Sequence, residues 1–169
     1  MAWNTDVIGV APRSTYRLAI DYDGTGYFVR GRRVADSSME FNTEEETETD
    51  ILGIIDTDVT NMAPRQSFPT VVTQEDGDFF LWLRDILRRR AFNELKGVRV
   101  LEIELYDGAT GSYAATSWPE STIVPQNQGG PGDGGRLMYE YEVALGGDPV
   151  VGTVDTAQHG VAITFTPTP

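Results

Sequence analysis

The stretch 78–106, DFFLWLRDILRRRAFNELKGVRVLEIELY, contains the two patterns that decide the fold. In its first half, apolar side chains recur at helical spacing and lie within one half of a 3.6-residue wheel. In its second half, over 98–106, apolar and polar side chains alternate with the period of two that a strand produces. We therefore predict one amphipathic helix at about 77–95, followed directly by a strand. The apolar residues of the helical half are Phe79, Phe80, Trp82, Leu83, Ile86, Leu87 and Ala91.

Short alternating segments with turn residues between them surround this helix. The segment 16–22 alternates and is followed by Asp23-Gly24, a strong tight-turn signal, so 16–34 is predicted to form a hairpin. The segment 136–145 alternates equally well, and shorter strands are expected near 112–118, 122–124, 150–154 and 161–165. Seven or more short strands and one helix predict a mainly β fold, an antiparallel β-sandwich or partly open barrel formed by one domain over 1–169.

The composition excludes several classes of function. The chain has 169 residues, 26 acids against 13 bases, a net charge of −13 and no Cys. A disulfide framework, a thiol nucleophile and a Cys-ligated zinc site are therefore impossible. The charge balance argues against a general duplex-DNA binder, which needs basic patches to neutralise phosphates. No apolar stretch is long enough to span a bilayer, and the first residues lack the basic and apolar regions of a signal peptide.

The acids concentrate between residues 36 and 58, which hold nine acids and no base. Because like charges repel and resist packing, we predict a long solvated acidic loop at the tip of a second hairpin, flanked by strands near 38–41 and 51–55. The segment 63–69 is predicted to be an extended connector. An N-terminal arm at 1–15 and a C-terminal tail at 155–169 complete the expected domain. The central acids of the loop are Glu44, Glu45, Glu46, Glu48 and Asp50.

Two carboxylate pairs lie on predicted strands. Glu102 and Glu104 share a face of one strand, and Glu140 and Glu142 share a face of another. Paired carboxylates can serve acid–base chemistry or hold a hard metal ion. A solvated strand face is the simpler interpretation, and an acidic wall that faces an aqueous channel is a third.

The bases also cluster, at the end of the predicted helix. A nucleic-acid patch there lacks interleaved exposed aromatic side chains. Two other interpretations are compensation of the helix dipole and a cationic interface that meets the acids of 36–58 in a neighbouring copy. The members of this possible basic interface patch are Arg84, Arg88, Arg89, Arg90 and Lys96.

No motif specific to an enzyme is present in the sequence. The run from Asp21 to Gly26 resembles the start of a calcium loop, but Arg32 stands where a bidentate Glu is required, so a hairpin turn is favoured. His159 is the only His, and no Gly-x-Ser-x-Gly elbow exists. We expect no enzymatic activity, no catalytic residue, no metal and no cofactor.

The order of these elements resembles that of the major tail tube proteins of long-tailed, siphovirus-type bacteriophages. The elements that carry the resemblance are the N-terminal arm, the first hairpin, the long acidic tip at 36–58, the extended segment 63–70, the single helix, the strand from Val98, the late hairpin from Arg136 and the final Thr-Pro-Thr-Pro. These proteins share a fold with the tubes of contractile tails and of type VI secretion. The resemblance covers nearly the whole chain as architecture.

The resemblance implies a structural virion protein located in the tail and assembled in the host cytoplasm. Its partners would be further copies of itself in stacked homohexameric rings, together with the tail tape measure, tail terminator and distal tail proteins. Viral DNA would pass through the lumen during ejection without specific binding, and no membrane would be involved. An acidic lumen repels phosphates, and Glu102, Glu104, Glu140 and Glu142 are the candidates to line it. The acidic loop would reach the adjacent subunit or ring.

Two other interpretations remain open from the sequence. A β-sandwich that binds carbohydrate or another surface would use exposed Trp3, Trp118 and tyrosines. Another virion component, such as a head–tail adaptor or a decoration protein, is an interpretation close to that of a tail tube protein. A metal-dependent enzyme that uses the glutamate pairs is the third interpretation.

Overall fold

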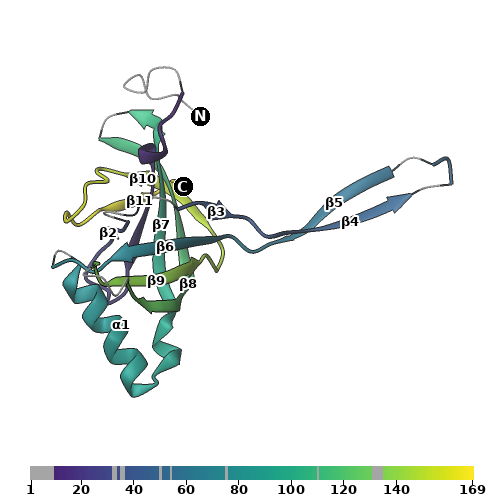
Figure 1. The fold of residues 1–169 in the computed structure, drawn as a ribbon. Helices are drawn as coiled ribbons and strands as arrows, with labels where there is room; N and C mark the ends of the chain where they lie inside the picture. The colour runs from purple at the N-terminus through teal and green to yellow at the C-terminus, as the bar shows by residue number, and fades with distance from the viewer. Residues whose placement is uncertain are drawn as a thin grey trace.

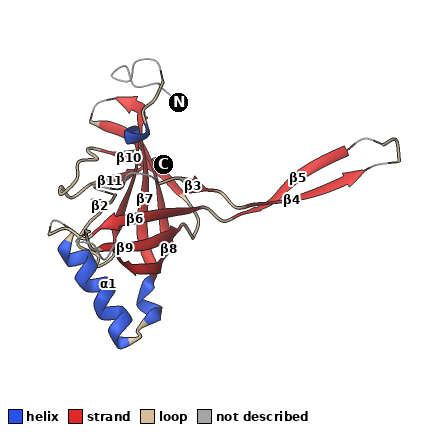
Figure 2. Cartoon of the chain, in the orientation of Figure 1, coloured by secondary structure: helices blue, strands red, loops and turns tan. Residues whose placement is uncertain are grey.

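A computed structural model describes residues 10–31, 34, 37–49, 51–53, 55–74, 76–109, 111–130 and 135–169. The fold is mainly antiparallel β with one α-helix, which confirms the predicted fold class (Figure 2). The strands are β1 (Tyr16–Asp21), β2 (Phe28–Val29), β3 (Met39–Glu40), β4 (Thr43–Thr49), β5 (Ile55–Met62), β6 (Arg65–Val71), β7 (Lys96–Ala109), β8 (Ser112–Gly129), β9 (Met138–Ala144), β10 (Val150–Val154) and β11 (Phe165–Pro167). The helix α1 (Gly77–Arg89) stands with two short 3₁₀ turns, η1 (Arg13–Thr15) and η2 (Phe92–Leu95).

Strand β8 organises the main sheet, whose order is β2-β1-β7-β8-β9-β6-β3. One edge of β8 pairs with β7. Its other edge pairs first with β10, which in turn pairs with β11, and further along the strand with β9. Nine strands belong to this sheet, and within the described residues it does not close into a barrel. The β4–β5 hairpin forms a separate two-stranded sheet that projects far from this body (Figure 1).

The sheet has a hydrophobic core on each of its faces. The larger core lies beneath α1, where Phe79, Leu83 and Ile86 pack against apolar residues of β1, β7 and β9. The smaller core lies between the other face and the C-terminal segment, where Leu101 and Ile103 pack with residues such as Ala157 and Ile163. Residues 155–165 are therefore part of the body rather than a free tail.

The helix is shorter than the sequence predicts. It ends at Arg89, and the capping residue Arg90 adopts the left-handed conformation with φ 57° and donates its backbone N–H to the carbonyls of Ile86 and Leu87. The 3₁₀ turn η2 occupies the rest of the predicted helix and buries Leu95. This early stop allows the chain to reverse and enter β7 beside the helix.

Three sequence predictions about strands need correction. The acidic segment is not a loop, because β4 itself carries four of the acids and pairs with β5. The connector predicted at 63–69 is β6, which pairs with β9 along its whole length. The two strands predicted around Pro119 are the single strand β8, which passes that proline through irregularities in its register with β7.

The turn between β1 and β2 uses the aspartates that resemble a calcium loop. Asp21 Oδ1 accepts hydrogen bonds from the backbone N–H groups of Gly24 and Gly26, at 2.7 and 3.4 Å. Asp21 Oδ2 pairs with Arg99 of β7. The carboxylate that would ligand calcium is thus committed to the hairpin turn, as the sequence favoured.

We expect Leu83→Ala to lower the free energy of unfolding by about 2–5 kcal/mol, because it leaves a cavity beneath the helix. Leu83 is fully buried, whereas Leu81 on the opposite side of the same helix is half exposed. Leu81→Ala is therefore the matched control, expected to cost less than about 1 kcal/mol. Urea denaturation measures both variants, and equal losses would contradict the packing described here.

Candidate functional site

The β4–β5 hairpin, here called the arm, is the most exposed part of the chain. All seven side chains of β4 are exposed, and so are the described side chains of β5. Seven cross-strand pairs hold the arm together, and a bulge lies between Glu44 and Glu45. An isolated two-stranded ribbon is only marginally stable in water. The arm therefore gains stability from any partner that covers it.

The register of the arm places like charges opposite each other. Glu46 pairs with Asp58, so their side chains share one face, and Glu48 lies on that face two residues further along. The other face carries Thr47 and Thr57, whose hydroxyl oxygens are 3.4 Å apart. Carboxylates directly opposite each other destabilise a strand pair. Contact with a cationic surface would relieve this repulsion.

The predicted loop acids mostly lie in β4. Glu44, Glu45, Glu46 and Glu48 are in that strand, and Asp50 lies outside the described residues. Beyond β4, the tip of the arm presents Ile51 and Leu52, with exposed fractions of 102% and 78%. The end of this acidic ribbon is therefore apolar, in contrast to its charged flank.

One member of the predicted basic patch at the end of the helix, Arg89, forms salt bridges with nearby acids. Arg89 contacts Asp85 at 2.7 Å and Glu94 at 3.0 Å, so its charge is balanced on its own surface. These contacts raise the pKa of Arg89 and lower the pKa of Glu94. The other predicted members are exposed, and Leu81 and Phe92 are exposed beside them. The four that remain as a cationic surface are Arg84, Arg88, Arg90 and Lys96.

The two glutamate pairs lie on opposite faces of the main sheet. Glu102 and Glu104 share the face of Val100, which belongs to the core beneath the helix. Glu140 and Glu142 alternate with the buried tyrosines of β9 and point away from that core. The structure therefore does not bring the four carboxylates together within one chain.

The environments of the two pairs also differ. Glu102 accepts hydrogen bonds from the Tyr16 hydroxyl at 2.7 Å and from the Trp118 indole N–H at 3.1 Å. Burial, together with the negative charge of Glu102, raises the pKa of the Tyr16 hydroxyl. Glu104 accepts a hydrogen bond of 2.5 Å from Tyr106. Glu142 lies 3.6 Å from Arg65 on a partly exposed surface.

These contacts bear on the alternative functions. Trp118 is half-buried, packs against the core beneath the helix and uses its indole N–H internally, so it does not form an open platform for a sugar. Trp3 lies outside the described residues. In the described part of the chain, no group of three or more His, Asp or Glu side chains could hold a metal ion. None of the described helices is long and apolar enough to cross a membrane.

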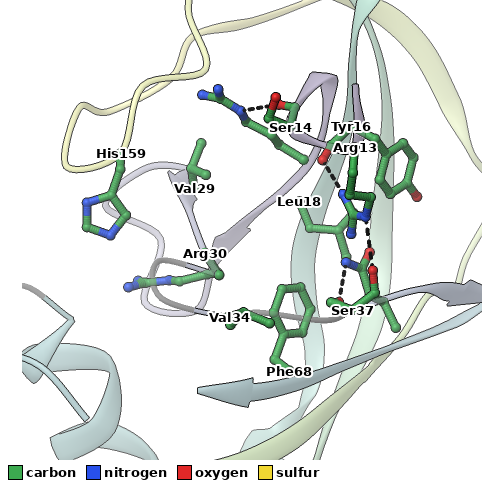
Figure 3. A pocket seen from close by; sticks show the side chains of 13 residues that line it. Arg13, Ser14, Tyr16, Leu18, Val29, Arg30, Val34, Ser37, Phe68 and His159 are labelled. Atoms are coloured by element: carbon green, nitrogen blue, oxygen red, sulfur yellow. Dashed lines mark hydrogen bonds between the residues drawn. The ribbon is translucent and has the colours of Figure 1, made fainter. Parts of the chain in front are cut away.

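A cationic pocket between β1, β2 and β6 was missed by the sequence analysis. Its volume is about 480 Å³, and Leu18, Val29 and Phe68 line its apolar part (Figure 3). Three arginines from two segments also line it: Arg13 and Arg17, in η1 and at the start of β1, and Arg30 directly after β2. The two segments are separated by the turn of the first hairpin, so no local pattern indicated that their arginines share a site.

One buried ion pair fixes the wall of this pocket. Arg30 Nη1 lies 2.6 Å from Asp76 Oδ1 at the start of the helix, and the side chains are 7% and 4% exposed. The Arg30 guanidinium also stacks over Phe79, 4.7 Å from the ring centroid. His159 Nε2, from the C-terminal segment, lies 3.4 Å from the same aspartate oxygen. Three distant parts of the chain therefore meet at Asp76.

We expect Asp76→Ala to lower the free energy of unfolding by about 3–5 kcal/mol, because it leaves the buried Arg30 charge unpaired. Asp85→Ala removes one of the two exposed carboxylate partners of Arg89 and is expected to cost about 1 kcal/mol or less. Denaturant titrations of both variants provide the test. A loss at Asp76 no larger than that at Asp85 would contradict the role assigned to the buried pair.

The fold is similar to those of solved proteins from injection systems. A chain of the cryo-EM structure of the anti-feeding prophage cap (AFP tube terminating cap) matches with a TM-score of 0.51 and 13% sequence identity, covering 88% of this chain and 95% of that one. A chain of the PVC sheath/tube terminator, from an extracellular contractile injection system in its extended state, matches with a TM-score of 0.53 and 10% identity. That match covers 86% of this chain and 98% of the other.

No protein family model and no curated protein matches the chain. At 10–13% identity, the structural likeness shows the fold alone. A tail-tube-like fold is thereby supported, whereas membership of the siphovirus major tail tube proteins in particular stays a prediction. The expectation of a non-enzymatic protein agrees with the described roles of the two matched assemblies, a tube cap and a sheath/tube terminator.

Proposed function

We propose that the chain is a structural subunit of a phage-like tail, which associates with further copies into hexameric rings that stack as a tube. The observation that carries this proposal is the arm, a fully exposed ribbon with like charges paired on one face and aliphatic side chains at its tip. A monomer gains nothing from such a ribbon, because it buries little surface and its charges repel. A neighbouring copy with a cationic surface would both bury the surface of the ribbon and balance its negative charges.

The proposal gives the two charged surfaces of the chain complementary roles. The arm is acidic, whereas the exposed cations Arg84, Arg88, Arg90 and Lys96 lie on α1 and on the chain between α1 and the start of β7. Opposite charges on separate surfaces of one molecule favour head-to-tail association, which closes into rings when the rotation allows it. In this arrangement the helix patch is one of the cationic surfaces offered to a neighbouring arm.

The proposed lumen is acidic and lets DNA pass without adhering. Six copies at −13 each carry −78 formal charges, and a negative wall repels phosphates. The two glutamate pairs lie on opposite faces of the sheet, so only one pair can face a lumen that is lined by one of these faces. We assign it to the face of Glu140 and Glu142, because both oxygens of Glu102 are already hydrogen-bonded inside the subunit. The partners proposed beyond the chain itself are the tail tape measure, tail terminator and distal tail proteins.

A second candidate function is a ring that closes the end of a tube rather than forming its length. The likeness to a tube terminating cap and to a sheath/tube terminator favours it. The two candidates differ in the assembly they predict, since a tube subunit stacks repeatedly and a terminator stops at one ring. Negative-stain microscopy of the purified protein distinguishes long tubes from single rings. A strict monomer at high concentration would overturn both candidates.

We expect Glu46→Lys to raise the concentration needed for assembly about tenfold at low salt, because it removes attraction to a cationic neighbour. The same substitution places a cation opposite Asp58, so the arm within the monomer becomes more stable. Glu45→Lys, on the other face of the same strand, is the matched control with an identical charge change and is expected to have less effect.

Light scattering against protein concentration, at about 0.05 M and 0.5 M salt, measures both arm variants. Screening at the higher salt reduces the difference between Glu46→Lys and the unchanged protein. If Glu46→Lys assembles as well as the unchanged protein at low salt, the acidic face has no part in association.

A further inference from the structure

The cationic pocket combines an apolar interior with a charged rim. Leu18, Val29 and Phe68 form the apolar part and are nearly inaccessible to water, while Val34 is half-buried beside them. Gly31 stands at the edge with φ +99°, and a Cβ there would lie 3.3 Å from the Phe68 ring. A side chain larger than hydrogen would therefore crowd the apolar part of the pocket.

Two arginines on the rim have no carboxylate partner in the part of the chain that the structure describes. Arg13 donates to the carbonyls of Ser37 and Tyr16, and Arg17 donates to those of Ser14 and Ala157. Within the described residues, neither arginine lies within salt-bridge distance of an acid. The rim is therefore positively charged, although the chain as a whole has twice as many acids as bases.

A buried acceptor in the pocket wall likewise has no hydrogen-bond donor among the residues that the structure describes. Gln66 is 2% exposed, and its Nε2 donates to Ser37 Oγ at 2.8 Å. Its Oε1 is buried and has no hydrogen-bond partner among the described residues. A buried amide oxygen without a donor is unfavourable. An occupant that supplies an N–H group removes this deficit.

We propose that the pocket receives the tip of the arm of a second copy of this chain, an inference that rests on the proposed function and names the surface where the arm binds. The tip matches the pocket in three respects. Ile51 and Leu52 are exposed aliphatic side chains for the apolar part, Glu48 is an exposed acid next to the tip for the arginine rim, and the turn brings peptide N–H groups for Gln66.

The arm of the same chain is directed away from the pocket. It leaves the body beyond β3 and β6 and extends outward from the sheet (Figure 1). Strands of this length span about 25 Å at roughly 3.3 Å per residue, so its tip lies well clear of the body. Docking therefore joins two molecules, and repetition from copy to copy builds the assembly.

A disulfide cross-link tests the assignment, and the absence of native Cys makes the result unambiguous. Ile51→Cys at the tip is combined with Ser14→Cys at the pocket rim, and the assembled full-length protein is oxidised mildly. Ser14 is exposed and lines the pocket. We expect a ladder of covalent oligomers on a non-reducing gel. Each single-Cys variant is a control and is expected to form no ladder.

The companion variant combines Ile51→Cys with Arg90→Cys on the helix patch. A ladder from this pair and none from Ile51→Cys with Ser14→Cys would overturn the pocket assignment and leave the proposed function standing. Assembly without either ladder would also overturn the pocket assignment alone. Absence of any assembly in the unchanged protein would overturn the proposed function, and this inference with it.

Assembly of Ile51→Ser supplies a second measurement. Because Ile51 is fully exposed in the monomer, its melting temperature is expected to stay unchanged, while the concentration needed for assembly rises about tenfold. Val59→Ser removes an exposed aliphatic side chain from the same arm away from the tip, and is expected to have a smaller effect. Equal effects of the two variants would show that the arm acts through its flank and would overturn insertion of the tip.

Discussion

The structure depends on how strand β8 shares its hydrogen bonds. One edge pairs with β7, and the other is divided between β10 and β9. Because the two partners of the divided edge lead to different parts of the chain, β8 joins the C-terminal strands to the β6–β9 region in one continuous sheet. The two cores form on opposite faces of that sheet, so the helix and the C-terminal segment each cover a surface that β8 holds in place.

Some carboxylates of the chain pair with arginines inside the subunit, whereas others stay exposed on the arm. Asp21 is committed to a turn and to Arg99, and Asp76 is committed to Arg30. The acids of the arm have no comparable arginine partner among the described residues, because the ribbon stands apart from the body. Ion pairs inside the subunit thus balance a few charges, whereas the exposed charges leave the arm acidic and the helix patch basic, as the proposed association requires.

Local sequence signals succeeded where one face of an element is buried and failed where pairing partners are distant. The helix and the alternating strands β7 and β9 follow from side-chain periodicity, because half of each is covered by core. Strand β6 was predicted to be an extended connector, yet β9 supplies pairing along its whole length. The acids of β4 suggested a loop. The segment is nevertheless a strand, because it pairs with β5 and because threonines, which favour strands, stand between the acids.

The sequence by itself determined the fold class, the position of the helix and the acidic character of the segment that became the arm, because composition and periodicity are local properties of the chain. Only the tertiary structure decided which groups meet. It placed the two glutamate pairs on opposite faces, balanced Arg89 with its neighbours, and gathered Arg13, Arg17 and Arg30 around one pocket. Such encounters follow from strand register and chain reversal, and these are settled by pairing between residues far apart along the chain.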